Sequence, residues 1–161
     1  MHSRLMVVSL CVLATAGCQT LGGHHPGTAT PAPATSSSTA ATAPAAPSPW
    51  QIAREHGMAF RAVGNEPGWD VEVQKSHTPT LFVNLDYGTH QLKVPNAAVT
   101  SDPKTATITF RGAATDGTPV QLKVVRGQCE DNMSGHQMEA AAELDVGARQ
   151  YKGCGRFLLQ H

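Results

Sequence analysis

The chain has 161 residues, with twelve basic and twelve acidic side chains, so it carries no formal net charge when histidine is counted as neutral. This length allows one domain of ordinary size, and the balanced charge gives no reason to expect a nucleic-acid-binding protein. Aromatic residues make up only 5% of the chain, which predicts a small hydrophobic core.

The first 17 residues have the pattern of a bacterial export signal. A short basic segment, residues 1–4, precedes an apolar run at residues 5–14, and small residues lead up to Cys18. The apolar run is too short to cross a bilayer. Its ending resembles the lipobox of bacterial lipoproteins, and this resemblance implies cleavage after residue 17 and lipid attachment to Cys18. The alternative is an ordinary signal peptide cleaved near Ala16.

The resemblance to lipoproteins also implies a location. Gln19, and not an aspartate, follows Cys18, and in the lipoprotein pattern this favours the outer membrane. The expected arrangement is a lipid-anchored protein that contacts the membrane through Cys18, with its folded domain facing the periplasm.

Residues 18–48 are expected to form a tether. From residue 28 to residue 49 every side chain belongs to Ala, Thr, Pro or Ser, and such a composition buries too little apolar surface to offset the entropy of ordering. The pair His24 and His25 lies in this tether and is expected to be solvated, with metal binding as the alternative. The folded domain is expected to span residues 49–161.

Cysteine usage predicts one disulfide. Cys11 is removed with the signal and Cys18 is consumed by the lipid, which leaves Cys129 and Cys154 as an even pair in an oxidising compartment. A bond between them closes a loop of about 26 residues and is expected to stabilise the domain by roughly 3–4 kcal/mol.

The pattern of the domain predicts an all-β fold: a small antiparallel meander barrel or curved sheet of about eight strands with one short N-terminal helix. Ser48, Pro49 and Gln51 form a helix-start signal and Gly57 a stop signal, which places the helix at about 49–56. Alternation of apolar and polar residues then predicts strands near 60–63, 69–74, 81–85, 91–94, 106–110, 120–124, 136–145 and 149–158.

The connections between these strands also follow from the sequence. Turn-forming residues stand at 86–88, 95–96 and 102–103, and Asp116-Gly117 is a signal for a two-residue hairpin. Residues 140–142 are three alanines with helical propensity. A strand is favoured there because a turn at 145–147 leads directly into a second alternating run.

Three segments together resemble a known family. The segments are Phe-Arg-Ala-Val-Gly-Asn-Glu-Pro-Gly-Trp at 60–69, Cys-Glu-Asp-Asn-Met-Ser-Gly at 129–135 and Tyr-Lys-Gly-Cys-Gly at 151–155. They are similar to a family of bacterial envelope lipoproteins whose members are often associated with META-type (heat-inducible lipoprotein) domains. The resemblance covers residues 58–158 and supports the envelope location and the disulfide, but it implies no particular activity.

Two of these segments supply the candidate binding residues, and each also has a structural interpretation. In the first segment the candidates face a ligand, or else they form a tight connection with the tryptophan filling the core. In the second segment they form a recognition loop, or else a structural turn in which the glycine adopts a positive φ angle. The candidates are Asn65, Glu66, Trp69, Asp131, Met133, Ser134, Gly135 and His136.

No cofactor or metal is expected. Residues 130–135 imitate the start of a calcium loop, but position twelve of that loop is Ala141, where a bidentate glutamate is required. Met133, His136 and Met138 are soft ligands for copper, with core packing as the alternative. Zinc binding by Cys129 and Cys154 requires free thiolates, which a disulfide removes.

The sequence contains no recognisable catalytic constellation. Gly-x-Ser-x-Gly, His-Glu-x-x-His and phosphate-loop motifs are absent from it, so an enzyme is not expected. We expect a non-catalytic binding or structural module that contacts an envelope protein, peptidoglycan or a small ligand at the barrel rim. The alternative is an inhibitor of a lysozyme-type peptidoglycan hydrolase, because Ser134-Gly135 is similar to the Ser-Gly loop that some lipid-anchored inhibitors of this class present to the enzyme.

Overall fold

The computed structural model describes residues 45–159. The signal segment, the lipidation site Cys18, the histidine pair at 24–25 and most of the expected tether therefore lie outside the described residues. Within residues 45–159, no helix is both long enough and apolar enough to cross a bilayer.

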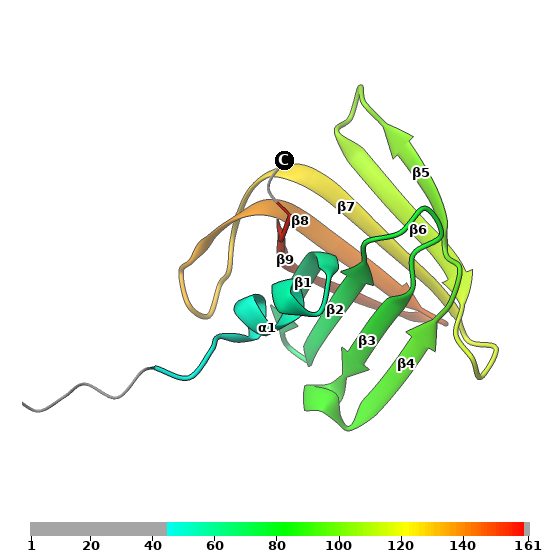
Figure 1. The fold of residues 1–161 in the computed structure, drawn as a ribbon, viewed down its shortest axis with the longest axis horizontal. Helices are drawn as coiled ribbons and strands as arrows, with labels where there is room; N and C mark the ends of the chain where they lie inside the picture. The colour runs from blue at the N-terminus through cyan, green and yellow to red at the C-terminus, as the bar shows by residue number, and fades with distance from the viewer. Residues whose placement is uncertain (1–44, 160–161) are drawn as a thin grey trace, which may run out of the picture. The chain divides into compact units, whose positions relative to one another are not determined.

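Nine antiparallel strands form one sheet that curls into a half-barrel (Figure 1). The spatial order is β4-β3-β2-β1-β9-β8-β7-β6-β5, so β4 and β5 form its two edges. The strands are β1 Met58–Asn65, β2 Gly68–Gln74, β3 Leu81–Leu85, β4 His90–Val94, β5 Ala98–Asp102, β6 Thr107–Ala113, β7 Pro119–Glu130, β8 Gln137–Val146 and β9 Arg149–Phe157.

One short helix precedes the sheet, as the sequence predicts. Helix α1, Pro49–Glu55, begins with a complete capping box, because the Ser48 side chain accepts a hydrogen bond from the Gln51 N–H and the Gln51 side chain accepts one from the Ser48 N–H. It packs through Ala53 onto a small buried cluster with Met58 and Leu158. The helix is thus fixed to the start of β1 and the end of the chain.

Alternation along the strands creates the core. In β1 and β3 the side chains alternate strictly between buried and half-buried positions, and along β8 buried positions alternate first with exposed and then with half-buried ones. Every strand except β5 contributes a buried residue to one continuous cluster. At one end the two halves of the sheet are also joined directly, because the Thr115 N–H donates to the Lys93 carbonyl at 2.9 Å.

The structure departs from the sequence prediction in two details. There are nine strands, one more than expected, and the additional strand is β5, whose five residues are all exposed and so lack the alternation that marks a half-buried strand. Asp116-Gly117 does not form a two-residue hairpin: the last pair of β6 and β7 is Ala113 with Pro119, so residues 114–118 make the connection. The alanines at 140–142 lie in a strand, as predicted.

The predicted disulfide is present and fastens the longest hairpin. Cys129 near the end of β7 is bonded to Cys154 in β9, with 5.6 Å between their Cα atoms, although β8 lies between these strands in the sheet. Pairing of β7 with β8 is irregular between Arg126 and Cys129, and Gly127 has φ +154° there. Figure 1 shows the hairpin curving strongly along its length. The bend and the disulfide together bring its tip toward β1.

Candidate ligand-binding groove

The segments that carry the candidate residues meet at one corner of the fold. Asn65 at the end of β1 donates from its side-chain Nδ2 to Asp131 Oδ1 at 2.5 Å and to Asn132 Oδ1 at 3.1 Å. The Trp69 indole Nε1 donates to the Lys152 carbonyl at 3.3 Å. Residues that are 66 and 83 positions apart in the chain are therefore joined at this corner.

Trp69 is a structural member of this junction. Its side chain is 5% exposed and its ring lies 6.3 Å from that of Tyr151. The indole covers Gly64, where an added Cβ atom would lie only 2.1 Å from Nε1. Trp69 therefore fills the core, which agrees with the structural interpretation of the first segment.

The glycines of the third segment are required by close strand packing. A Cβ atom added to Gly153 would lie 2.0 Å from the Val63 carbonyl oxygen, and one added to Gly155 would lie 2.4 Å from the Phe60 ring. Strands β1 and β9 thus approach each other more closely than residues with side chains permit. This contact sets the position of the corner.

The turn between β7 and β8 is organised by Asp131. Its carboxylate accepts hydrogen bonds from the Ser134 hydroxyl and from the Ser134 N–H, the latter at 3.1 Å, while its carbonyl accepts from the Gly135 N–H at 2.7 Å. The Ser134 hydroxyl donates the hydrogen bond that most strongly lowers the pKa of Asp131, and the Asn65 side chain lowers it further. Gly135 has φ +68°, which confirms the positive φ angle of the structural interpretation.

These bonds divide the candidates into two groups. Asn65, Asp131 and Ser134 direct their polar atoms at one another and at the backbone, so they hold the corner together. Glu66 and His136 are exposed, and Met133 at the tip of the turn is 71% exposed. Met133 is therefore the large apolar side chain that this turn offers to a partner.

Tyr87 is a site residue that the sequence analysis did not identify. It lies in the 3₁₀ turn Asp86–Gly88 between β3 and β4, with φ +59°, and its side chain is 78% exposed. The hydroxyl nevertheless donates to the Asn65 carbonyl at 3.0 Å, and the ring covers Gly68, where an added Cβ atom would lie 2.4 Å from two ring carbons. The ring is thus anchored at its edge and on one face, while most of its surface is open to solvent.

Tyr87 and Met133 both line a groove of about 400 Å³. A polar row on the outer face of the sheet lines the same groove: Asp70, Asn84 and Gln91 stand directly opposite one another on β2, β3 and β4. Asn84 Nδ2 donates to Asp70 Oδ2 at 3.0 Å. The groove thus combines exposed apolar side chains with an ordered line of polar groups.

Arg61 fixes the charge at this groove. Its guanidinium donates to Glu72 and lies 3.2 Å from the Asp70 carboxylate, and its side chain is largely buried. The carboxylates of Asp70 and Glu72 therefore share one cation, so these three side chains together keep one net negative charge beside the groove.

A second pocket, of about 590 Å³, lies beside α1 and the end of β9. Its charged residues are already bonded, because Arg156 donates to the Gln137 carbonyl, Arg54 donates to the Leu158 carbonyl and Glu139 accepts from the Phe157 N–H. Apart from Met138, weighed as a copper ligand, it contains none of the residues that the sequence indicated. The groove at Tyr87 and Met133 is the stronger candidate because its polar groups are less fully used.

The described residues do not assemble a metal centre. Within residues 45–159, no group of three or more His, Cys, Asp or Glu side chains is placed to hold a metal ion. Met133 and Met138 line different pockets, so the soft ligands proposed for copper do not share one. Cys129 and Cys154 are bonded to each other and offer no thiolate to zinc.

Comparison with known proteins gives the chain no relatives: it matches no family model, no curated protein and no solved structure. The resemblance of its three segments to envelope lipoproteins therefore stays a hypothesis.

Proposed function

We propose that this protein is a lipid-anchored binding module of the outer membrane, without catalytic activity, that holds its ligand in the groove at Tyr87 and Met133. The observation that carries this proposal is that the Tyr87 ring is held by the Asn65 carbonyl and Gly68 although most of its surface is exposed to solvent. A ring that is ordered before binding loses little conformational entropy when a ligand covers it.

The rim location supports the same proposal. The groove lies where three parts of the chain meet: the ends of β1 and β2 that flank their turn, the 3₁₀ turn before β4 and the β7–β8 tip. Loops held on a rigid sheet are common sites of recognition. The disulfide and the Asn65–Asp131 bond fix the tip that carries Met133.

The proposal that the protein is lipid-anchored rests on the sequence. Cys18 follows a signal-like segment, and about 30 residues with little capacity to fold separate it from α1. Such a tether places a binding domain in the periplasm within reach of peptidoglycan and of envelope proteins.

Site-specific photo-crosslinking in cells tests the proposed groove. A crosslinking amino acid at Met133 is expected to give a defined adduct, while the same group at Val99, an exposed residue of β5 that does not line the groove, gives none. The adduct at Met133 should disappear when Tyr87→Ala is added. Identical adducts at both positions, or none at either, would contradict a binding site here.

Hydrolase inhibition is the second candidate function. The exposure of Met133 and His136 favours it, since an inhibitory loop must enter an enzyme cleft. The Ser134 hydroxyl, however, is bonded to Asp131 and also accepts from the His136 N–H at 3.3 Å, which favours a structural role for that serine. Stoichiometric inhibition of a c-type lysozyme that is lost in the variant Ser134→Ala, His136→Ala would establish the inhibitor function instead.

A further inference from the structure

We infer that the ligand of this groove is a neutral saccharide, bound with an apolar ring face against Tyr87 and its hydroxyl or amide substituents toward Asn84 and Gln91. The inference rests on the proposed function, because it names the class of ligand for the same groove. Three properties of the lining support it: an anchored aromatic face, a row of carboxamides and a net negative charge that disfavours anions.

The first property is the aromatic face. A pyranose ring has a face of C–H groups surrounded by hydroxyls, and it binds well where a flat apolar surface meets polar groups. Tyr87 provides such a surface, because Gly68 supports one face of its ring and the hydroxyl is held by the Asn65 carbonyl. Met133 adds a second, adaptable apolar contact on the same groove.

The second property is the row of carboxamides. Asn65, Asn84 and Gln91 all line the groove, and each carboxamide offers both donors and an acceptor. Asn84 uses Nδ2 for Asp70, and its Oδ1 makes no hydrogen bond within residues 45–159. The Gln91 side chain is exposed and makes none within the same residues. Sugar hydroxyls and acetamido groups, which also donate and accept, complement such groups.

The third property is the charge at the groove. Among the residues that line the groove, Arg61 and Asp70 are the charged ones, and they lie 3.2 Å apart. Glu72 also contacts the Arg61 guanidinium, so two carboxylates share one cation and an anionic ligand would meet their net negative charge. A cationic ligand would compete with Arg61 for Asp70, which also accepts a hydrogen bond from Asn84. A neutral polar ligand avoids both costs. The groove volume of about 400 Å³ also falls within the range of about 300–1,000 Å³ that is typical of small-molecule sites.

Titration calorimetry with a soluble N-acetylglucosamine oligomer tests this inference on the full chain, in a detergent without a sugar headgroup. We expect saturable binding that Tyr87→Ala weakens at least tenfold, because the stacking surface is lost. Gln91→Ala should weaken it roughly fivefold, the effect of one hydrogen bond. Val99→Ala, on an exposed strand outside the groove, is the matched control and should bind as the unchanged chain does. Equal unfolding midpoints for the unchanged chain and all three variants would show that the losses are not due to misfolding.

Two further probes separate the inference from the proposed function. An unglycosylated peptidoglycan stem peptide and a lysine-rich peptide are titrated under the same conditions. If either peptide binds in a Tyr87-dependent way and the sugar oligomer does not, the saccharide inference is wrong while the groove remains a binding site. If the oligomer binds equally well to the Tyr87→Ala and unchanged chains, the assignment of the saccharide to this groove is also wrong. Absence of a Met133 adduct in the crosslinking experiment would instead show that the groove is not a binding site.

Discussion

Gly153 and Gly135 both lie in the segments that resemble the lipoprotein family, but the structure requires glycine at each for a different reason. At Gly153 the constraint is space, since an added Cβ atom would meet the Val63 carbonyl oxygen at 2.0 Å. At Gly135 the space is open and the constraint is the φ angle of +68°. Composition alone cannot distinguish these two requirements.

Alanine substitution should separate them. Gly153→Ala forces β1 and β9 apart and is expected to lower the free energy of unfolding by about 3 kcal/mol, the upper range for overpacking. Gly135→Ala should cost about 1 kcal/mol, the usual penalty for a left-handed residue with a Cβ atom. Denaturant unfolding of both variants measures the difference. Equal losses would show that the strands separate easily and that the close approach is not a constraint.

Asp131 is expected to make the stability of this corner depend on pH. Because the Ser134 and Asn65 hydrogen bonds lower its pKa in the folded state, the folded protein binds this proton less readily than the unfolded chain does. The resulting stabilisation is complete above the unfolded pKa of about 4 and is lost as the pH falls through the lower folded pKa. Asp131→Asn should therefore lower the melting temperature at pH 7, and the deficit should shrink toward pH 2–3. A deficit that is independent of pH would show that the charge of Asp131 does not contribute.

At the scale of elements, the β7–β8 hairpin depends on its fastening to β9. Three features act on the same hairpin: the irregular pairing at 126–129, the disulfide to Cys154 and the Asn65 bond to the tip. The bend aims the tip at β1, and the other two hold it there. Because Met133 is carried by this tip, the groove is expected to exist only while the hairpin is held.

Removing the disulfide should therefore affect both stability and binding. The variant Cys129→Ala, Cys154→Ala is expected to lose roughly 3–4 kcal/mol of unfolding free energy, which corresponds to a fall of well over 10 °C in melting temperature for a domain of this size. Below its melting temperature the variant should also lose the Met133 crosslink. Thiol labelling of the denatured, unreduced protein should find neither cysteine free. Full labelling of both would mean that the bond does not form in the cell.

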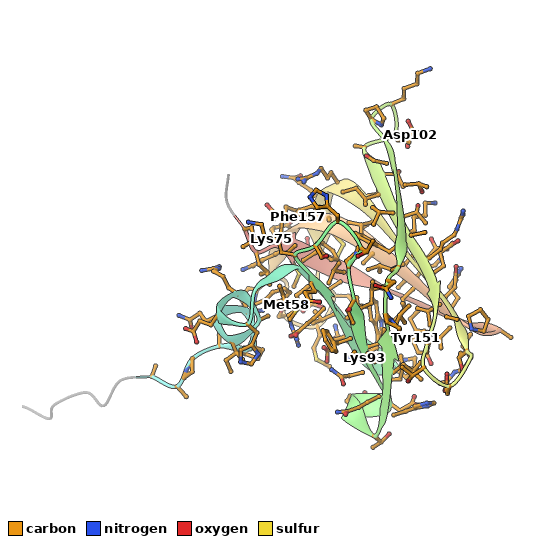
Figure 2. The ribbon with its side chains drawn as sticks, turned by 45° about the vertical axis from the view of Figure 1, so that its right-hand side comes forward. Met58, Lys75, Lys93, Asp102, Tyr151 and Phe157 are labelled. Carbon is orange, nitrogen blue, oxygen red and sulfur yellow. A yellow bond between two sulfur atoms is a disulfide. The ribbon has the colours of Figure 1, made fainter. Side chains whose placement is uncertain are left out.

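Strand β5 shows where sequence patterns stop being informative. It is an edge strand whose five residues are all exposed. Figure 2 shows its last residue, Asp102, near the tip of a hairpin that extends away from the body of the fold. Tyr151, by contrast, lies inside the fold. Strands are recognised in sequence by one buried face. A strand without a buried face carries no such signal, so β5 could not be predicted, whereas β1 or β8 could.

At the scale of the whole molecule, the parts of the site that depend on local sequence could be predicted, and the parts that depend on contacts between distant segments could not. The turn at 131–136 and the core position of Trp69 follow from local chemistry, and both are structural alternatives that the sequence predicts. The contact of Asn65 with Asp131 depends on how far the sheet curls, which local patterns do not encode. Tyr87 was missed because an Asp-Tyr-Gly segment signals only a turn, and its role arises from Gly68 and Asn65 beneath it.

The proposed anchor determines whether this groove works at the membrane or free in the periplasm. If Cys18 is lipidated, the tether confines the domain to a layer near the bilayer, which raises its effective concentration toward ligands fixed in the envelope. The full chain should then sediment with the outer membrane and incorporate labelled fatty acid. Cys18→Ala should abolish the label and leave the protein unprocessed or released, with no change in the unfolding midpoint of the domain, because Cys18 begins the expected tether and the folded domain is expected to start at residue 49. Cys11→Ala, in the apolar run of the signal, is the matched control and should leave labelling unchanged. A Cys18→Ala protein that still carries fatty acid and sediments with membranes would show that the anchor lies elsewhere.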